Sequence, residues 1–361
     1  MWLYNPARRT WTVTRWDALS SQWESDMSQS LSVRVCRRVA ASLAVVMAVA
    51  APVAAQNAAA PKKAPASSTV PRTPDGHPDL QGVWSFATLT PLQRPDNVAG
   101  RTHLTDAEIK EIETKSNTRP ESFGLFGDYP KYAFDKRTSL VVDPPDGKVP
   151  PMTAAGKQRQ DVRSEARKIA DNPEDLPVYE RCILGFNAGP PILPGGYNQN
   201  AQIVQTREHF VIHTEMVHTA RIIRIDDSPR LPNHIRQWNG DSRARWEGDT
   251  LVVTTTHFKS IGTGTLMLDG NLARTGIGWS PDENLTLTEK FTRLDNDTLI
   301  YEFTIDDPTV WSKSWTVREP WTRNDSNMYE YACHEGNYDM KNMLSGARAP
   351  DPPAAPPTNS R

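Results

Sequence analysis

A series of short alternating segments in the second half of the chain is the feature that most constrains its fold. From about Asn198 onward, apolar, β-branched and aromatic residues alternate with polar ones, and turns separate the stretches. Alternation with period two is typical of a strand with one buried face, and turns between strands indicate an antiparallel meander. The predicted strands span residues 200–206, 209–218, 221–226, 250–258, 284–294, 298–306, 314–322 and 329–334.

Eight or more such strands can close into a barrel, which removes exposed edges and can enclose one small ligand. Two earlier segments, 82–87 and 138–142, have the same character and can join the sheet. Gly82-Val83-Trp84 is similar to the Gly-x-Trp motif of lipocalins, in which the tryptophan closes one barrel end. We therefore expect a mainly β protein: an antiparallel up-and-down meander that closes into a lipocalin-like barrel with a hollow lumen. An open sandwich is the alternative.

The N-terminal region has the pattern of an export signal. Basic residues from Arg34 to Arg38 precede an apolar run over 39–51 and a small-residue cleavage site at 53–55. The run is too short to span a membrane, so residues 1–55 read as a leader and signal peptide that starts at Met27. We expect a periplasmic or secreted protein.

The remaining chain divides into a linker, one domain and a tail. Residues 56–78 and 347–361 are rich in Ala, Pro and Ser and predict disordered segments. The barrel domain should occupy 79–346, with a small N-terminal helical annex made of helices near 105–115 and 153–170. Thr105 and Glu108 form a capping-box pattern, and Thr153 precedes the second helix.

Composition excludes several classes of protein. Lys and Arg total 41 against 43 acidic residues, and removing residues 1–55 takes away six bases and three acids, which leaves a formal charge of −5. A mildly acidic chain has no electrostatic attraction for nucleic acid or an anionic membrane, and we expect neither a nucleic-acid partner nor a membrane span. The 30 prolines argue against a mainly helical body.

Cleavage of the signal peptide leaves two of the three cysteines, Cys182 and Cys333. In an oxidising compartment, a disulfide between them is the simplest interpretation. The alternative is a nucleophilic Cys333 beside His334, but adjacent strand residues point to opposite faces.

The segment from Glu215 to Arg221 brings an acid, His218 and a guanidinium together, and a carboxylate can orient a histidine for proton transfer. Strand alternation places Phe210, Ile212 and His218 on the inward face and Glu215 on the other, so a catalytic pair requires a bulge. A buried, hydrogen-bonded His218 is the structural alternative.

Residues 239–249 are the densest polar loop, in which Asp241, Arg243 and Trp246 form either a structural corner or the mouth of a binding site. A metal set of His213, Glu215, His218, His257, His334 and Glu335 lacks the spacing of a helical zinc motif, so we expect no metal. The turn-rich loop 186–197 is not accompanied by a Gly-x-Ser-x-Gly elbow, a phosphate loop or a dinucleotide fingerprint, and no cofactor is expected.

Several motifs resemble a large family of secreted bacterial proteins without a characterised function. The resemblance covers about residues 75–348 and implies no activity. Its motifs are Pro78-Asp-Leu-Gln-Gly-Val-Trp84, Ser139-Leu-Val-Val-Asp-Pro-Pro-Asp-Gly147, Glu180-Arg-Cys182, Glu215-Met-Val-His218, Arg236-Gln-Trp-Asn-Gly-Asp-Ser-Arg243, Arg245-Trp-Glu-Gly-Asp-Thr-Leu-Val-Val253 and Tyr329-Glu-Tyr-Ala-Cys-His-Glu-Gly-Asn337.

Two hypotheses follow. The first is a binding protein whose lumen holds or carries a small amphipathic or apolar compound. The expected ligand contacts are Trp84, Arg221, Trp246, Tyr301 and Trp315, although the aromatic stripe is also typical of a core. The second is a cofactor-independent acid/base enzyme, such as a lyase, isomerase or hydrolase. Its expected residues are His218 or His334 as base or acid, Asp241, Glu335 or Glu215 as the orienting carboxylate, and Arg243 for a developing anion.

Overall fold

The computed structural model describes residues 2–5, 10–13, 70–118, 135–260, 266–267, 278–279 and 282–349. The chain forms two compact units, Met1–Ala66 and Ser67–Arg361. In the first unit, β1 (Trp2–Asn5) and β2 (Thr10–Val13) pair antiparallel. The remainder of the predicted leader and signal peptide, residues 56–69 of the predicted linker and residues 350–361 of the predicted tail lie outside the described residues.

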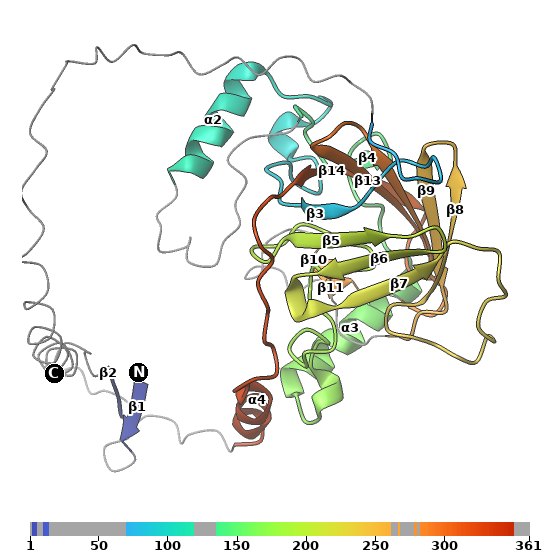
Figure 1. The fold of residues 1–361 in the computed structure, drawn as a ribbon. Coiled ribbons are helices and arrows are strands. Elements are labelled where there is room, and N and C mark those ends of the chain that lie inside the picture. The colour runs from blue at the N-terminus through green and yellow to red at the C-terminus, as the bar shows by residue number, and fades with distance from the viewer. Residues whose placement is uncertain are drawn as a thin grey trace, which may run out of the picture. The chain divides into compact units, whose positions relative to one another are not determined.

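The second unit contains a closed barrel, which confirms the predicted fold class (Figure 1). Nine strands follow one another around the ring in chain order, and β14 pairs with both β13 and β3 to close it. Neighbours are antiparallel except for β7 and β8, which are parallel and share the single register pair Arg224↔Arg243. The strands are β3 (Gly82–Ser85), β5 (Asn200–Gln205), β6 (His209–Thr214), β7 (Ala220–Arg224), β8 (Asp241–Glu247), β9 (Thr250–Thr256), β12 (Thr286–Arg293), β13 (Thr298–Asp306) and β14 (Trp315–Arg323).

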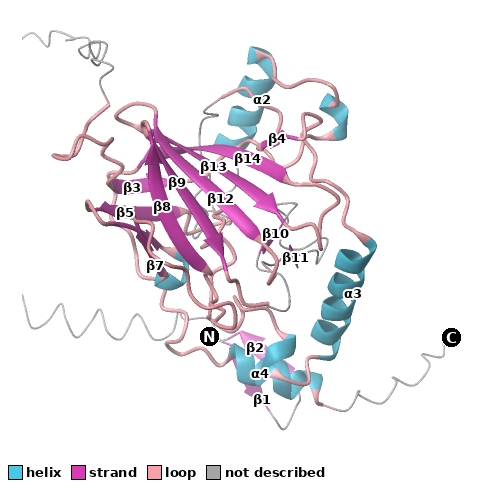
Figure 2. Cartoon of the chain, turned by 90° about the vertical axis from the view of Figure 1, so that its right-hand side faces the viewer, coloured by secondary structure: helices cyan, strands magenta, loops and turns pink. Residues whose placement is uncertain are grey.

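Two smaller β elements lie outside this ring. β4 (Val141–Asp143) adds to β14, and β10 (Leu266–Met267) pairs with β11 (Gly278–Trp279). Figure 2 shows β8, β9, β12 and β13 side by side in this order. Alternation along each strand places one set of side chains in the lumen and the other set outside.

Three sequence predictions about strands were wrong. Residues 241–247 form β8 rather than a loop, and residues 329–334 form no strand. The strand predicted over 209–218 stops at Thr214, because a turn of 3₁₀ helix (Met216–His218) with positive φ at Val217 and His218 follows it.

The helices lie outside the barrel. α2 (Asp106–Asn117) begins with the predicted capping box of Thr105 and Glu108, and α3 (Ala154–Ile169) begins at Thr153, whose hydroxyl accepts a hydrogen bond from the Gly156 amide. A third helix, α4 (Asp339–Ala347), was not predicted.

One barrel end, the hairpin end, carries the tight turns after β5, β8 and β12 and is sealed by the segment before β3. The Trp84 indole lies 0% exposed over this end and donates to the Leu80 carbonyl at 3.0 Å, and the Arg293 guanidinium covers its ring at 5.3 Å. Gln205 bonds the Leu80 amide at 2.8 Å and the Pro78 carbonyl at 3.1 Å. Trp84 thus closes the barrel, as expected from the Gly-x-Trp pattern.

Residues 70–78 were predicted to be disordered but pack on the β8–β9 hairpin. Arg72 forms an ion pair with Asp249 at 2.7 Å, and the His77 ring stacks on Trp246 with centroids 4.4 Å apart. Trp246 therefore helps to hold residues 70–78 against the β8–β9 hairpin.

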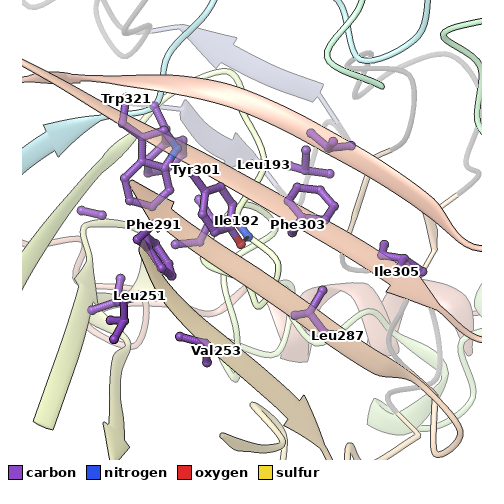
Figure 3. Packing of buried hydrophobic residues seen from close by; sticks show 14 of the residues in the cluster. Ile192, Leu193, Leu251, Val253, Leu287, Phe291, Tyr301, Phe303, Ile305 and Trp321 are labelled. Atoms are coloured by element: carbon purple, nitrogen blue, oxygen red, sulfur yellow. Dashed lines mark hydrogen bonds between the residues drawn. The ribbon is translucent and has the colours of Figure 1, made fainter. Parts of the chain in front are cut away.

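At the opposite end, the loop end, residues 186–197 enter the barrel, and we call this segment the plug loop. Ile192 and Leu193 are 1% and 5% exposed and belong to the same cluster as the lumen-facing aromatic residues (Figure 3). Tyr301, Phe303 and Trp315 are 0% exposed, which leaves no water-sized gap beside them. Among the described residues the lumen is therefore filled, rather than hollow as expected, because aromatic wall residues and the plug loop occupy it.

Candidate functional site

A buried polar network lies in the lumen beneath the plug loop. Arg221 of β7 donates to both carboxylate oxygens of Glu289 on β12, with an Nη1–Oε1 distance of 2.9 Å. Its Nη2 also donates to Thr255 Oγ1 at 2.8 Å and Ser242 Oγ at 3.0 Å. Because Glu289 is 0% and Arg221 8% exposed, this ion pair is almost completely removed from water.

Tyr301 joins this network to the plug loop. Its hydroxyl donates to Glu289 Oε1 at 2.7 Å and accepts from the Ile192 amide at 3.2 Å. Burial, followed by the nearby Glu289 charge, raises the pKa of Tyr301 well above its ordinary value. The phenol is thus a neutral group whose oxygen receives a hydrogen bond from the plug.

Glu319 on β14 is a second fully buried acid in the barrel. Its Oε1 accepts from Trp321 Nε1 at 2.7 Å, and its Oε2 has no hydrogen-bond partner among the described residues. Burial raises the pKa of Glu319 to about 8, while the Trp321 hydrogen bond and the Arg137 charge lower it by less. The carboxyl is consequently protonated at neutral pH.

Glu319 should make stability pH-dependent. Its folded pKa of about 8 lies above the ordinary 4.5, so the folded state holds an extra proton between these values and loses stability as pH rises. The expected loss is on the order of 3 kcal/mol between about pH 5 and about pH 7.5. Glu319→Gln should remove this loss, as measured by urea unfolding at both pH values.

The control for this experiment is Glu302→Gln, which alters a carboxylate of the partly exposed Lys290–Glu302 pair. It should retain the wild-type pH dependence. Equal pH dependence in wild type and Glu319→Gln would contradict a raised pKa at Glu319.

Glu215 and His218 adjoin the same turn but have different partners. Glu215 is 4% exposed and accepts from Asn200 Nδ2 at 2.7 Å and from the Tyr329 amide at 3.2 Å. His218 is exposed, and its Nδ1 lies 3.2 Å from the Tyr331 carbonyl oxygen. The carboxylate thus fastens the C-terminal segment to the barrel, and both of its oxygens are engaged away from the imidazole.

Asp241 and Arg243 form a corner at the start of β8. Asp241 accepts from Arg243 at 2.5 Å and from the Leu231 amide at 3.0 Å. Arg243 also donates to Ser228 Oγ at 3.0 Å and to the Pro229 carbonyl at 2.9 Å. His218 lies in the 3₁₀ turn before β7, and its ring contacts the Tyr331 carbonyl rather than Asp241. The structure therefore does not bring the predicted acid, base and anion-binding group together.

His334 and Glu335 are exposed and follow the predicted disulfide, which the structure contains between Cys182 and Cys333. His334 lines a groove of about 320 Å³ together with Glu180, Arg181 and Cys182. A disulfide is typical of proteins from an oxidising compartment, and it argues against the nucleophilic Cys333.

The residues expected to contact a ligand lie in three places. Arg221 and Tyr301 belong to the lumen network, Trp84 and Trp315 are fully buried core residues, and Trp246 is a partly buried residue near the hairpin end that packs against the edge of the core and stacks on His77. Glu289 and Glu319 are functional candidates that were not predicted from the sequence. The signal was present, because each is the acid within an apolar series of one parity: Leu287, Glu289 and Phe291, and Val317, Glu319 and Trp321.

The described residues contain no group of three or more His, Cys, Asp or Glu side chains suited to a metal ion. No described helix is both long enough and apolar enough to cross a membrane. No protein-family model matches the chain, and no curated protein does either. The function must therefore be inferred from the lumen and its plug.

Proposed function

We propose that this is an exported binding protein that holds a small amphipathic compound in the barrel lumen after the plug loop moves aside. The observation that carries this proposal is the hydrogen bond from the Ile192 amide to the Tyr301 hydroxyl. It places a polar group of the loop on a buried polar network, and aliphatic side chains among the aromatic residues around it. The plug loop thus occupies the position that an amphipathic guest would take.

The barrel wall does not depend on the plug loop for its backbone pairing. The nine strands close the ring through their own register pairs. Apart from the Ile192 bond and a side-chain hydrogen bond between Tyr197 and Tyr331, the plug-loop hydrogen bonds described run within 185–199, including those from Asn187 to the Tyr197 and Asn198 carbonyls. Displacing the loop therefore removes contacts with the lumen but breaks no strand pairing.

A neutral fluorescent probe, Nile red, tests this function. If probe and plug compete, Ile192→Ala should tighten saturable binding by at least about tenfold. The substitution removes most of a buried isoleucine side chain, and the loss of its burial destabilises the closed state. The matched control is Ile222→Ala on the outer face of β7, where Ile222 is 68% exposed, and it should bind as wild type does. Absence of saturable binding, or equal affinity in wild type and Ile192→Ala, would refute the proposal.

An acid/base enzyme is the second candidate, and the observation that favours it is Glu319. A carboxyl held protonated at neutral pH can serve as a general acid. It is sealed in the barrel, so this function also requires movement of the plug loop. Loss of turnover with retained probe binding in Glu319→Gln would identify an enzyme. The same measurement on His218→Ala, Asp241→Ala and His334→Ala tests the catalytic residues expected from the sequence.

A further inference from the structure

The charges beneath the plug loop cancel. Arg221 is the one positively charged group of the network, and each of its three nitrogens already donates: Nε to Ser242, Nη1 to Glu289, and Nη2 to Ser242, Thr255 and Glu289. Glu289 uses both oxygens on Arg221 and accepts from Tyr301 as well. The network therefore has neither a free cation nor a free anion to offer a guest.

The Arg293 guanidinium, at the hairpin end, also has all of its nitrogens engaged in hydrogen bonds. It donates to the carbonyls of Asp79, Asp295 and Asn296 and covers the Trp84 ring. A carboxylate entering from the loop end would meet the Glu289 charge, and the described lumen residues offer it no unpaired cation. Because an unpaired charge removed from water is costly, such a guest is disfavoured.

The plug loop indicates which polar group is favoured. The Tyr301 proton is directed to Glu289, so the phenol oxygen is left as an acceptor, and in the closed barrel it takes the Ile192 N–H. A guest that replaces the loop must supply a donor in the same place, since an unsatisfied buried acceptor lowers affinity. Its remaining part must be apolar to replace Ile192 and Leu193.

Given the lumen-binding function proposed above, we infer that the lumen selects uncharged aliphatic compounds with a hydrogen-bond donor at one end, such as an alcohol or a primary amide. It selects them over the carboxylate or ammonium of the same chain length. Glu289 determines this selection, because it neutralises Arg221. Without the Glu289 charge, Arg221 becomes a site for a carboxylate.

The test measures how octanol, octanamide, octanoate and octylamine displace Nile red from the full disulfide-bonded protein at pH 7. Octanol and octanamide should bind at least about tenfold more tightly than the two charged compounds, which corresponds to about 1.4 kcal/mol. Glu289→Gln should raise the affinity of octanoate relative to octanol by a similar factor. The control Glu302→Gln, the same substitution on the outer face of the neighbouring strand β13, should leave the ratio unchanged.

A second measurement requires only the wild-type protein, in case Glu289→Gln fails to fold. Octanoate should bind at least about tenfold more tightly at about pH 5 than at pH 7. Its carboxyl group titrates in the same range as a glutamic acid side chain, so a larger fraction of it is the neutral acid at the lower pH. The charged or titratable groups that face the lumen from the described strands are Arg221, Glu289, Arg293, Tyr301 and Glu319.

The outcomes separate the two proposals. Octanoate or octylamine binding as tightly as octanol, or octanoate affinity that does not increase at the lower pH, would overturn the selection of neutral guests while the binding function stands. Failure of all four compounds and of Nile red to bind would overturn the binding function itself. An unchanged octanoate-to-octanol ratio in folded Glu289→Gln would overturn the role of Glu289.

Discussion

Replacing Cys182 and Cys333 together by alanine is expected to lower the free energy of unfolding by about 5 kcal/mol. The disulfide joins residues 151 positions apart, and its loss allows the unfolded chain many more conformations. The link also fastens the segment that carries Tyr329 and Tyr331 next to the start of the plug loop. Urea unfolding of the oxidised wild type and the double variant measures the difference.

Wild type reduced with dithiothreitol is the matched control, and its unfolding midpoint should approach that of the double alanine variant. A difference below about 1 kcal/mol between oxidised wild type and variant would mean that the unfolded state is already restricted without the disulfide.

Glu289→Ala is expected to destabilise the protein by about 3–5 kcal/mol, because it leaves the Arg221 guanidinium buried without its ionic partner. The Tyr301 hydroxyl loses its acceptor in the same variant. Replacing both charges at once, with Arg221→Met and Glu289→Leu, should recover most of the loss, since neither charge then remains in the lumen. Urea unfolding of the single and double variants measures both effects.

Glu302→Ala provides the comparison on the outer face of β13. Its ion pair with Lys290 spans 3.4 Å between partly exposed side chains, so the expected change is at most about 1 kcal/mol. A Glu289→Ala variant that unfolds at the wild-type urea concentration would contradict the importance of the buried pair.

Much of the fold could be predicted from residue alternation. β5, β9, β12 and β13 begin and end within two residues of the predicted positions, because in each of them every second residue forms one buried, mostly apolar face. β8 was missed since two of its inward residues, Ser242 and Ala244, are small, and its outward residues are charged. Residues 329–334 alternate like a strand, but a disulfide and Glu215 hold them instead of a neighbouring strand.

The candidate site was harder to predict. Asp241, Arg243 and Glu215 were chosen because such groups can do chemistry, whereas in the structure their hydrogen bonds fasten loops. The prolines and glycines of the loop 186–197 predict a stiff segment rich in turns, but nothing local in its sequence indicates that Ile192 enters the barrel. Arg221 was recognised as a ligand-facing candidate, while its partner Glu289 is 68 residues away and is brought to it by closure of the ring.

The parallel junction between β7 and β8 divides the ring into two continuous leaves. One leaf is formed by β3, β5, β6 and β7, and the other by β8, β9, β12, β13 and β14. The backbones of the two leaves share one register pair at the β7–β8 joint. They share two, Thr322↔Ser85 and Arg323↔Trp84, at the β14–β3 joint. Arg221 lies on the first leaf, and its partners Ser242, Thr255 and Glu289 lie on the second. These side-chain bonds therefore link the two leaves across the joint that has the fewest backbone pairs.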